Sequence, residues 1–148
     1  MQGLINLCEC GPNDGGLVIV PDTHKIHKEF ITKLGKGDFP KDWHPFSEEE
    51  KKDPIFETAI KICGKPGDLM MWDSRTFHCN TRPTTQNIRA CVYICQVPKK
   101  NISQEWRKKR EEAFKALKCC SHHPAEFRDL YIPKKFNPWD VVKKISVK

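Results

Sequence analysis

His78 and Arg89 are the two residues of this chain whose types and spacing point most directly to chemistry. They stand eleven positions apart (89 − 78 = 11). The segment 67–73 precedes the histidine, and the apolar run 88–97 contains the arginine. A histidine at the end of a strand can ligate a metal ion, and the planar guanidinium of an arginine suits bidentate binding of a carboxylate. The pair therefore indicates a metal site with a carboxylate-binding arginine on the next strand.

Each of the two residues also has a plainer interpretation. By the two-residue period of a strand, Arg89 shares a face with Cys91 and Tyr93. If that face points inward, the guanidinium needs a carboxylate partner, because an unpaired buried charge costs several kcal/mol. The alternatives are a solvent-facing strand or an internal Asp or Glu partner. A single histidine near a strand end is more often a hydrogen-bonded surface group, and Asp73 either orients His78 or caps a turn.

The elements that must position these residues are read from hydrophobic periodicity and turn signals. Helices are expected at 24–34 and 104–118, the second with Ser103 as its N-cap. The first two strands are expected to form a hairpin around the glycine-rich turn at 11–16. Strands are expected at 2–8, 17–20, 58–63, 69–72, 76–80 and 88–97.

Short strands separated by turn signals every 8–12 residues predict a mainly β fold, a sandwich or barrel with peripheral helices. The 148-residue length fits a single domain. Within residues 1–100, the polar stretch 35–57 is interpreted as an insertion over the mouth of the barrel. Residues 101–148 are expected to form a C-terminal helix and a tail that packs back across the surface.

Two longer motifs make the pattern more specific. Residues 13–25 read N-D-G-G-L-V-I-V-P-D-T-H-K, and residues 66–78 read P-G-D-L-M-M-W-D-S-R-T-F-H. Together with Arg89 they resemble the phytanoyl-CoA dioxygenase family, over most of residues 1–135. The resemblance implies a double-stranded β-helix, the cupin-like jelly roll. It also implies Fe(II) held by two histidines and one carboxylate, with 2-oxoglutarate and O₂ as cosubstrates and ascorbate as reductant.

The resemblance also assigns roles to particular residues. His78 matches the distal iron-binding histidine, and Arg89 matches the arginine that binds the C5 carboxylate of 2-oxoglutarate. Asn80 stands where a small polar residue helps to hold the cosubstrate. The implied reaction couples oxidative decarboxylation of 2-oxoglutarate to succinate with hydroxylation of a small molecule. No catalytic residue is implied beyond the metal site, and the sequence names no substrate.

The family's H-x-D motif, which supplies the other two iron ligands, lies upstream of the strand matched by residues 2–8 and is absent here. The single H-x-[DE] in the chain is His27-Lys28-Glu29. It is rejected because positions i and i+2 of a helix point to different faces. We therefore expect a jelly roll that is incomplete at the N-terminus, a fragment or truncated form of a hydroxylase that is inactive by itself. The alternative is a non-catalytic jelly-roll module that binds a small acid or a partner protein.

Net charge and apolar runs limit which other functional classes fit this sequence. The net charge is +7, and its densest basic run is 107–110. Nucleic-acid binding is the less favoured reading, because Glu111 and Glu112 follow that run directly and a solvated helix face explains it. No apolar run approaches the roughly 18 residues of a membrane span, and no signal peptide is recognised. The expected location is the cytoplasm.

Eight cysteines raise the question of disulfides or zinc. No C-x-x-C pair is present, and structural zinc sites usually contain one. We therefore expect reduced thiols. The cluster of Cys119, Cys120, His122 and His123 has no recognised ligand spacing, so it is not expected to hold zinc.

Overall fold

The computed structural model describes residues 1–35, 44–118, 123 and 126. It divides into two compact units, Met1–Gln96 and Val97–Lys148, and each is treated by itself below. Within the described residues, no helix has the length and apolar character needed to cross a membrane.

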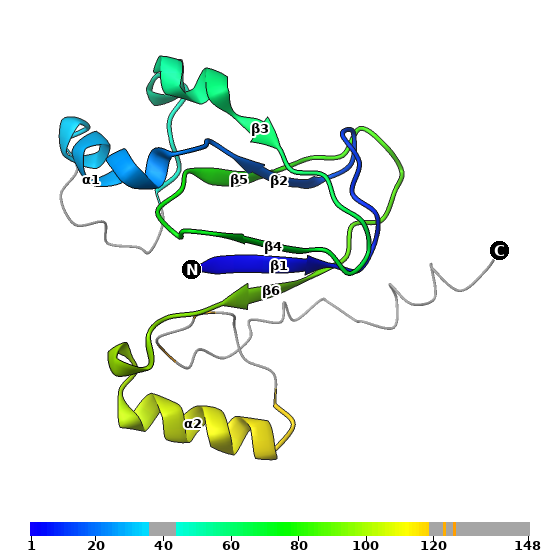
Figure 1. The fold of residues 1–148 in the computed structure, drawn as a ribbon, viewed down its shortest axis with the longest axis vertical. Coiled ribbons are helices and arrows are strands. Elements are labelled where there is room, and N and C mark those ends of the chain that lie inside the picture. Colours follow the sequence, from blue (N-terminus) through cyan, green and yellow to red (C-terminus); the bar gives the residue numbers. More distant parts are fainter. Residues whose placement is uncertain (36–43, 119–122, 124–125, 127–148) are drawn as a thin grey trace. The chain divides into compact units, whose positions relative to one another are not determined.

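The first unit contains two three-stranded antiparallel sheets (Figure 1). One has the order β4-β1-β6, and the other has the order β3-β2-β5. The prediction of a mainly β fold is confirmed. The strands are β1 (Gln2–Asn6), β2 (Gly16–Ile19), β3 (Ile60–Lys61), β4 (Leu69–Trp72), β5 (His78–Thr81) and β6 (Cys91–Cys95).

The expected hairpin between the first two strands is wrong, because β1 and β2 belong to different sheets. Strand β1 lies between β4 and β6, where Leu4 faces Met70 on one side and Tyr93 on the other. Leu4 is almost completely buried there. The glycine-rich loop therefore crosses from one sheet to the other instead of folding β2 back onto β1.

The last strand is shorter than expected. It runs over Cys91–Cys95, so Arg89 lies just before it and not inside it. Pairing with the β1 segment continues one residue further, because the Leu7 amide donates to the Ala90 carbonyl at 2.9 Å. Arg89 is thus held next to the sheet by the backbone. Strand β4 agrees with the prediction, whereas the strands expected at 2–8, 58–63 and 76–80 have shifted or shorter bounds.

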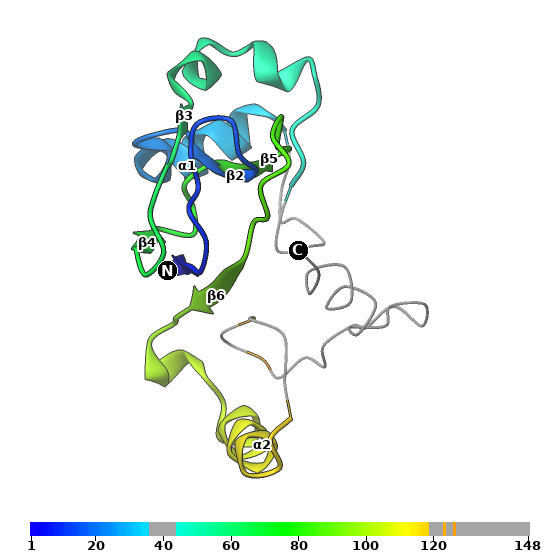
Figure 2. The same ribbon diagram turned by 90° about the vertical axis from the view of Figure 1, so that its right-hand side faces the viewer.

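One helix and two 3-10 helices accompany the β3-β2-β5 sheet (Figure 2). Helix α1 (Thr23–Lys33) confirms the prediction, and it ends before Gly35, whose φ of 65° favours glycine. The 3-10 helices η1 (Glu50–Lys52) and η2 (Pro54–Thr58) belong to the expected insertion 35–57, of which residues 36–43 lie outside the described residues. The core of this layer consists of Val20, Phe30 and Phe77, with Ile26, Ile31, Leu34, Phe46, Ile55 and Phe56 packed against it.

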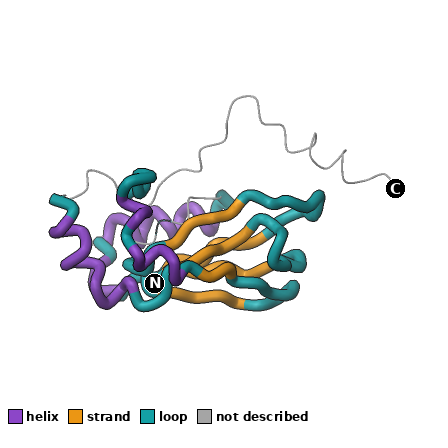
Figure 3. Tube along the Cα trace, turned by 90° about the horizontal axis from the view of Figure 1, so that it is seen from above, coloured by secondary structure: helices purple, strands orange, loops and turns teal. Residues whose placement is uncertain are grey.

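Loops gather at one end of the strands of the first unit (Figure 3). The buried carboxylate of Asp14 joins two of them, because it accepts hydrogen bonds from the Gly11 amide (2.8 Å), Thr85 Oγ1 (2.5 Å) and Asn87 Nδ2 (2.9 Å). These bonds hold the pKa of Asp14 below its ordinary value, the Thr85 hydroxyl having the largest effect. The loop that leads to Arg89 is therefore tied to the loop that leads to β2.

The second unit contains the 3-10 helix η3 (Lys99–Asn101) and helix α2 (Gln104–Lys115). The N-cap prediction is confirmed, since Ser103 Oγ accepts from the Trp106 amide at 3.2 Å. The expected end at residue 118 is wrong, because the chain leaves the helix after Lys115. Leu117 has a φ of 52°. Almost all of the tail 121–148 lies outside the described residues.

Candidate functional site

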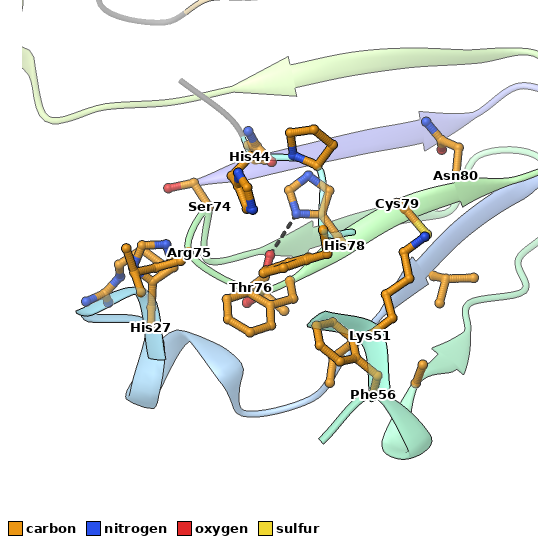
Figure 4. Close-up of a pocket in the computed structure, with 18 residues that line it drawn as sticks. His27, His44, Lys51, Phe56, Ser74, Arg75, Thr76, His78, Cys79 and Asn80 are labelled. Carbon is orange, nitrogen blue, oxygen red and sulfur yellow. Dashed lines mark hydrogen bonds between the residues drawn. The ribbon is translucent and has the colours of Figure 1, made fainter. Parts of the chain in front are cut away.

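A cavity of about 750 Å³ lies beside β5 in the first unit (Figure 4). Its wall is built by β1, β2, α1, the segment 44–59 and the turn that leads into β5. The residues that line it are Gln2, Val18, Val20, His27, Ile31, His44, Pro45, Phe46, Lys51, Phe56, Ala59, Ser74, Arg75, Thr76, Phe77, His78, Cys79 and Asn80.

His78 and Asn80, two of the three residues predicted from the sequence, line this cavity together. They alternate along β5, so both side chains point to the same side of the strand, away from Cys79 (Figure 4). Strand β5 is the edge of its sheet and pairs with β2, where His78 faces Ile19. The histidine therefore lies on a strand that has one neighbour, β2, among the described strands of its sheet.

The orientation of the His78 ring is fixed by a backbone hydrogen bond. Its Nδ1 lies 2.7 Å from the Thr76 carbonyl oxygen. A carbonyl can only accept, so Nδ1 carries a proton, and in the neutral ring the lone pair is on Nε2. The Trp72 ring lies beside it, with centroids 5.4 Å apart. This is the tautomer that a metal-binding histidine needs, with the second nitrogen oriented by the protein.

The buried hydroxyl of Thr23 holds the start of this segment. Its Oγ1 donates to the Val20 carbonyl at 2.7 Å and accepts from the Phe77 amide at 2.8 Å. The Val20 amide in turn donates to the Phe77 carbonyl at 2.8 Å. The residue before His78 is thus bound through both of its backbone polar groups. Sequence reasoning missed Thr23, although it stands in the 13–25 motif.

The two readings of Asp73 are resolved by its contacts. Its carboxylate accepts from Arg75 Nε at 3.0 Å, Arg75 Nη2 at 2.8 Å and the Arg75 amide at 2.9 Å. This pair holds the pKa of Asp73 far below its ordinary value. Asp73 therefore caps the turn between β4 and β5, and the Thr76 carbonyl, not Asp73, orients His78.

Arg89 is not among the residues that line the cavity. It is half-buried, and its Nη1 donates to the Tyr93 hydroxyl at 3.4 Å. Its Nη2 is buried, and no described residue accepts a hydrogen bond from it. Among described residues it also forms no ion pair with an Asp or Glu, so the internal-carboxylate alternative finds no partner there.

Two histidines that sequence reasoning did not assign to the site also line the cavity. His27 comes from α1, and burial followed by the nearby Arg75 charge lowers its pKa. His44 comes from the insertion and contacts Glu50 at 3.2 Å. In the part of the chain that the structure describes, no three His, Cys, Asp or Glu side chains gather closely enough to hold a metal ion.

The expectation of reduced cysteines is confirmed where the structure can test it. The thiols of Cys8, Cys10, Cys63, Cys79, Cys91 and Cys95 are free. The prediction that the C-terminal cysteine–histidine cluster holds no zinc stays untested. Three of its four members lie outside the described residues: Cys119, Cys120 and His122.

Known proteins are similar in sequence to this chain. The phytanoyl-CoA dioxygenase (PhyH) family model matches residues 1–91. "Ava biosynthesis cluster protein O" of Aspergillus versicolor is 31% identical over 134 residues, covering 83% of this chain and 41% of the relative. A "Putative phytanoyl-CoA dioxygenase" of Dictyostelium discoideum is 26% identical over 117 residues, covering 79% of this chain and 32% of the relative. No solved structure matches significantly.

The chain thus spans less than half the length of each of these relatives. The family model covers more than half of this chain, including both motifs, His78 and Arg89. The chain therefore belongs to the phytanoyl-CoA dioxygenase family.

Proposed function

We propose that this protein is an Fe(II)- and 2-oxoglutarate-dependent hydroxylase in which His78 is an iron ligand. The observation that carries the proposal is the hydrogen bond between His78 Nδ1 and the Thr76 carbonyl, which leaves Nε2 as the ligating nitrogen beside a cavity. Family membership supports the same chemistry. Iron bound with 2-oxoglutarate and O₂ supplies the oxidising power for hydroxylation.

Arg89 is assigned to the far carboxylate of 2-oxoglutarate. Its buried Nη2 lacks an acceptor among the described residues, and an unsatisfied buried donor is costly. A carboxylate would satisfy that nitrogen with a charge-assisted hydrogen bond. Asn6 of β1 pairs with Cys91 of β6, so their side chains lie on one face of the sheet. The buried Nδ2 of Asn6 also lacks an acceptor among the described residues. Asn80 is assigned to the cosubstrate from its place beside His78 in the cavity.

The finer fold assignment is also a proposal. Two antiparallel sheets with the orders β4-β1-β6 and β3-β2-β5 are consistent with part of a double-stranded β-helix. His78 alone cannot hold iron in a facial triad, since that site takes two histidines and one carboxylate. We assign the other two ligands to an H-x-D segment outside this sequence, placed where it can reach His78 Nε2.

The test is succinate formation from 2-oxoglutarate with Fe(II) and ascorbate. We expect no turnover above background from the 148-residue chain alone, and turnover after the chain is extended upstream with a family H-x-D segment. In the extended protein, His78→Ala and Arg89→Ala should each abolish it. His24→Ala and Arg82→Ala are matched controls and should not. Turnover that survives His78→Ala would refute the assignment of the iron ligand.

A second candidate is a non-catalytic module that binds a small acid through Arg89. Its support is the buried Arg89 Nη2, which lacks an acceptor among the described residues. It predicts that the extended protein binds 2-oxoglutarate and loses that binding in Arg89→Ala, but forms no succinate under any metal condition.

A further inference from the structure

We infer that the cavity beside His78 takes an uncharged small molecule with an apolar, ring-bearing body. Its role as the substrate rests on the proposed function, because that reaction would occur at the His78 end of the cavity. Binding of such a ligand is independent of iron and 2-oxoglutarate, so it can be tested separately.

The wall of the cavity is built mainly from aromatic and aliphatic side chains. Phe46, Phe56 and Phe77 form an aromatic group with ring centroids 4.9 to 5.9 Å apart. Val18 and Ile31 extend the same surface from β2 and α1. The rings are fixed by their mutual packing and by the core residue Phe30, so the apolar surface is already formed before a ligand arrives.

Two long basic side chains line the cavity, but each is neutralised by a carboxylate of this chain. Arg75 forms a bidentate pair with Asp73, whose closest contact is 2.8 Å. Lys51 binds Glu48 at 2.6 Å. Neither carboxylate residue lines the cavity. An anionic ligand would have to compete with an existing ion pair for either cation, so these residues offer it little net attraction.

Two of the three histidines that line the cavity, His27 and His44, give an anionic ligand little attraction. Burial lowers the pKa of His27, which favours the neutral form of its ring. His44 lies 3.2 Å from the Glu50 carboxylate, so the pair carries at most zero net charge. A cationic ligand finds no partner either, since no Asp or Glu is among the described residues that line the cavity. An uncharged ligand requires neither a broken ion pair nor a counter-charge from these residues.

Uncharged polar side chains also line the cavity. Ser74 and Asn80 lie on either side of His78 (Figure 4). They can hydrogen-bond a hydroxyl or carbonyl of an uncharged ligand. The volume of about 750 Å³ is within the range of small-molecule sites. The phosphates of a coenzyme A thioester, in contrast, would find no cation without an ion-pair partner among the described residues that line the cavity.

The test compares two probes with the same ring system and different charge, 2-naphthalenemethanol and 2-naphthoate. Binding to the 148-residue chain is followed by NMR of the side-chain methyl groups. We expect the alcohol to shift the methyl resonances of Ile31 and Val18, and to bind at least tenfold more tightly than the carboxylate. Equal or tighter binding of the carboxylate, or shifts confined to methyls outside the cavity, would overturn the inference.

Variants test the reasons for the preference. Glu48→Gln releases Lys51 and should strengthen naphthoate binding several-fold without weakening the alcohol. Glu105→Gln is its control, because it breaks a comparable pair with Lys109 in α2 (2.7 Å). Ala59→Trp should fill the cavity and abolish binding of both probes, whereas Ala116→Trp in the second unit should not. If naphthoate binding responds equally to both glutamine variants, the local charge argument is wrong.

These results separate the inference from the proposed function. Probe binding as expected, with no succinate from the extended protein, would support the ligand class inferred for the cavity and contradict the hydroxylase proposal. Succinate formation without binding of the uncharged probe would support the hydroxylase proposal and refute the inferred ligand class.

Discussion

Removing the Thr23 hydroxyl should be among the most damaging small changes in the first unit. The side chain is fully buried, and Thr23→Val keeps its shape while deleting both hydrogen bonds. The Phe77 amide loses its acceptor, and the Val20 carbonyl loses the hydroxyl donor. Each buried group left unsatisfied costs about 1–3 kcal/mol, so the free energy of unfolding should fall by about 2–6 kcal/mol. Thr23→Ser keeps the hydroxyl and loses one methyl group, which costs about 1 kcal/mol.

Urea denaturation of the purified chain measures this difference in stability. A second readout follows His78 itself, because the Phe77 amide fixes the segment that holds the ring. Nitrogen-15 NMR should show His78 protonated at Nδ1 in the wild type and in Thr23→Ser, and a mixture of tautomers in Thr23→Val. If Thr23→Val is as stable as Thr23→Ser and keeps the same tautomer, the hydroxyl does not position His78.

Three further predictions concern other parts of the chain. The pKa of Asp14 is lowered in the folded state, so the stability that its carboxylate provides is complete above the unfolded pKa of about 3.9. That stability is lost as the pH falls through the folded pKa. Asp14→Asn should therefore destabilise the chain much more at pH 6 than at pH 2.5, as measured by denaturation at each pH. Ser103→Ala should lower the stability of α2 by about 1 kcal/mol, and Ser103→Asp should restore it, as followed by circular dichroism. Protein purified without added metal should contain no stoichiometric zinc by elemental analysis, and zinc that disappears when Cys119 and Cys120 are both replaced would contradict this.

Local pattern was sufficient for the elements that carry the chemistry. The apolar run Leu69–Trp72 after a tight turn predicted β4, and the capping serine at 103 predicted the start of α2. The strand expected at 76–80 contained both His78 and Asn80, and both lie on β5. These features depend on residues close in sequence, so periodicity and turn chemistry determine them.

Pairings between distant segments were not predictable in the same way. The glycine-rich sequence at 11–16 is compatible with a hairpin, but β1 pairs with β4 and β6, some 65 to 90 residues later in the chain. The aromatic wall has the same origin, since Phe46 and Phe56 come from a stretch whose composition is polar. Tertiary packing, not local propensity, decides both cases.

Arg89 depends both on local sequence pattern and on contacts between distant segments. Its charge in an apolar run indicated a need for a carboxylate, and the structure leaves its buried Nη2 without an acceptor among the described residues. Yet the segment before β6 is placed by contacts that the sequence does not reveal, chiefly the Asp14 carboxylate bonded to Thr85 and Asn87.

Completion of the sheet and completion of the metal site should be a single event. His78 lies on β5, which pairs with β2 on one side and has no described strand on the other. The free backbone groups of an edge strand accept a further strand readily. An H-x-D segment paired there would bring its ligands toward His78 Nε2 and cover the edge at the same time. We therefore expect the extended protein to gain thermal stability over the 148-residue chain even without iron, and to gain more when Fe(II) is added anaerobically. His78→Ala should remove only the second gain. An extension that restores turnover without any metal-free stabilisation would show that the ligands arrive by another route than the β5 edge.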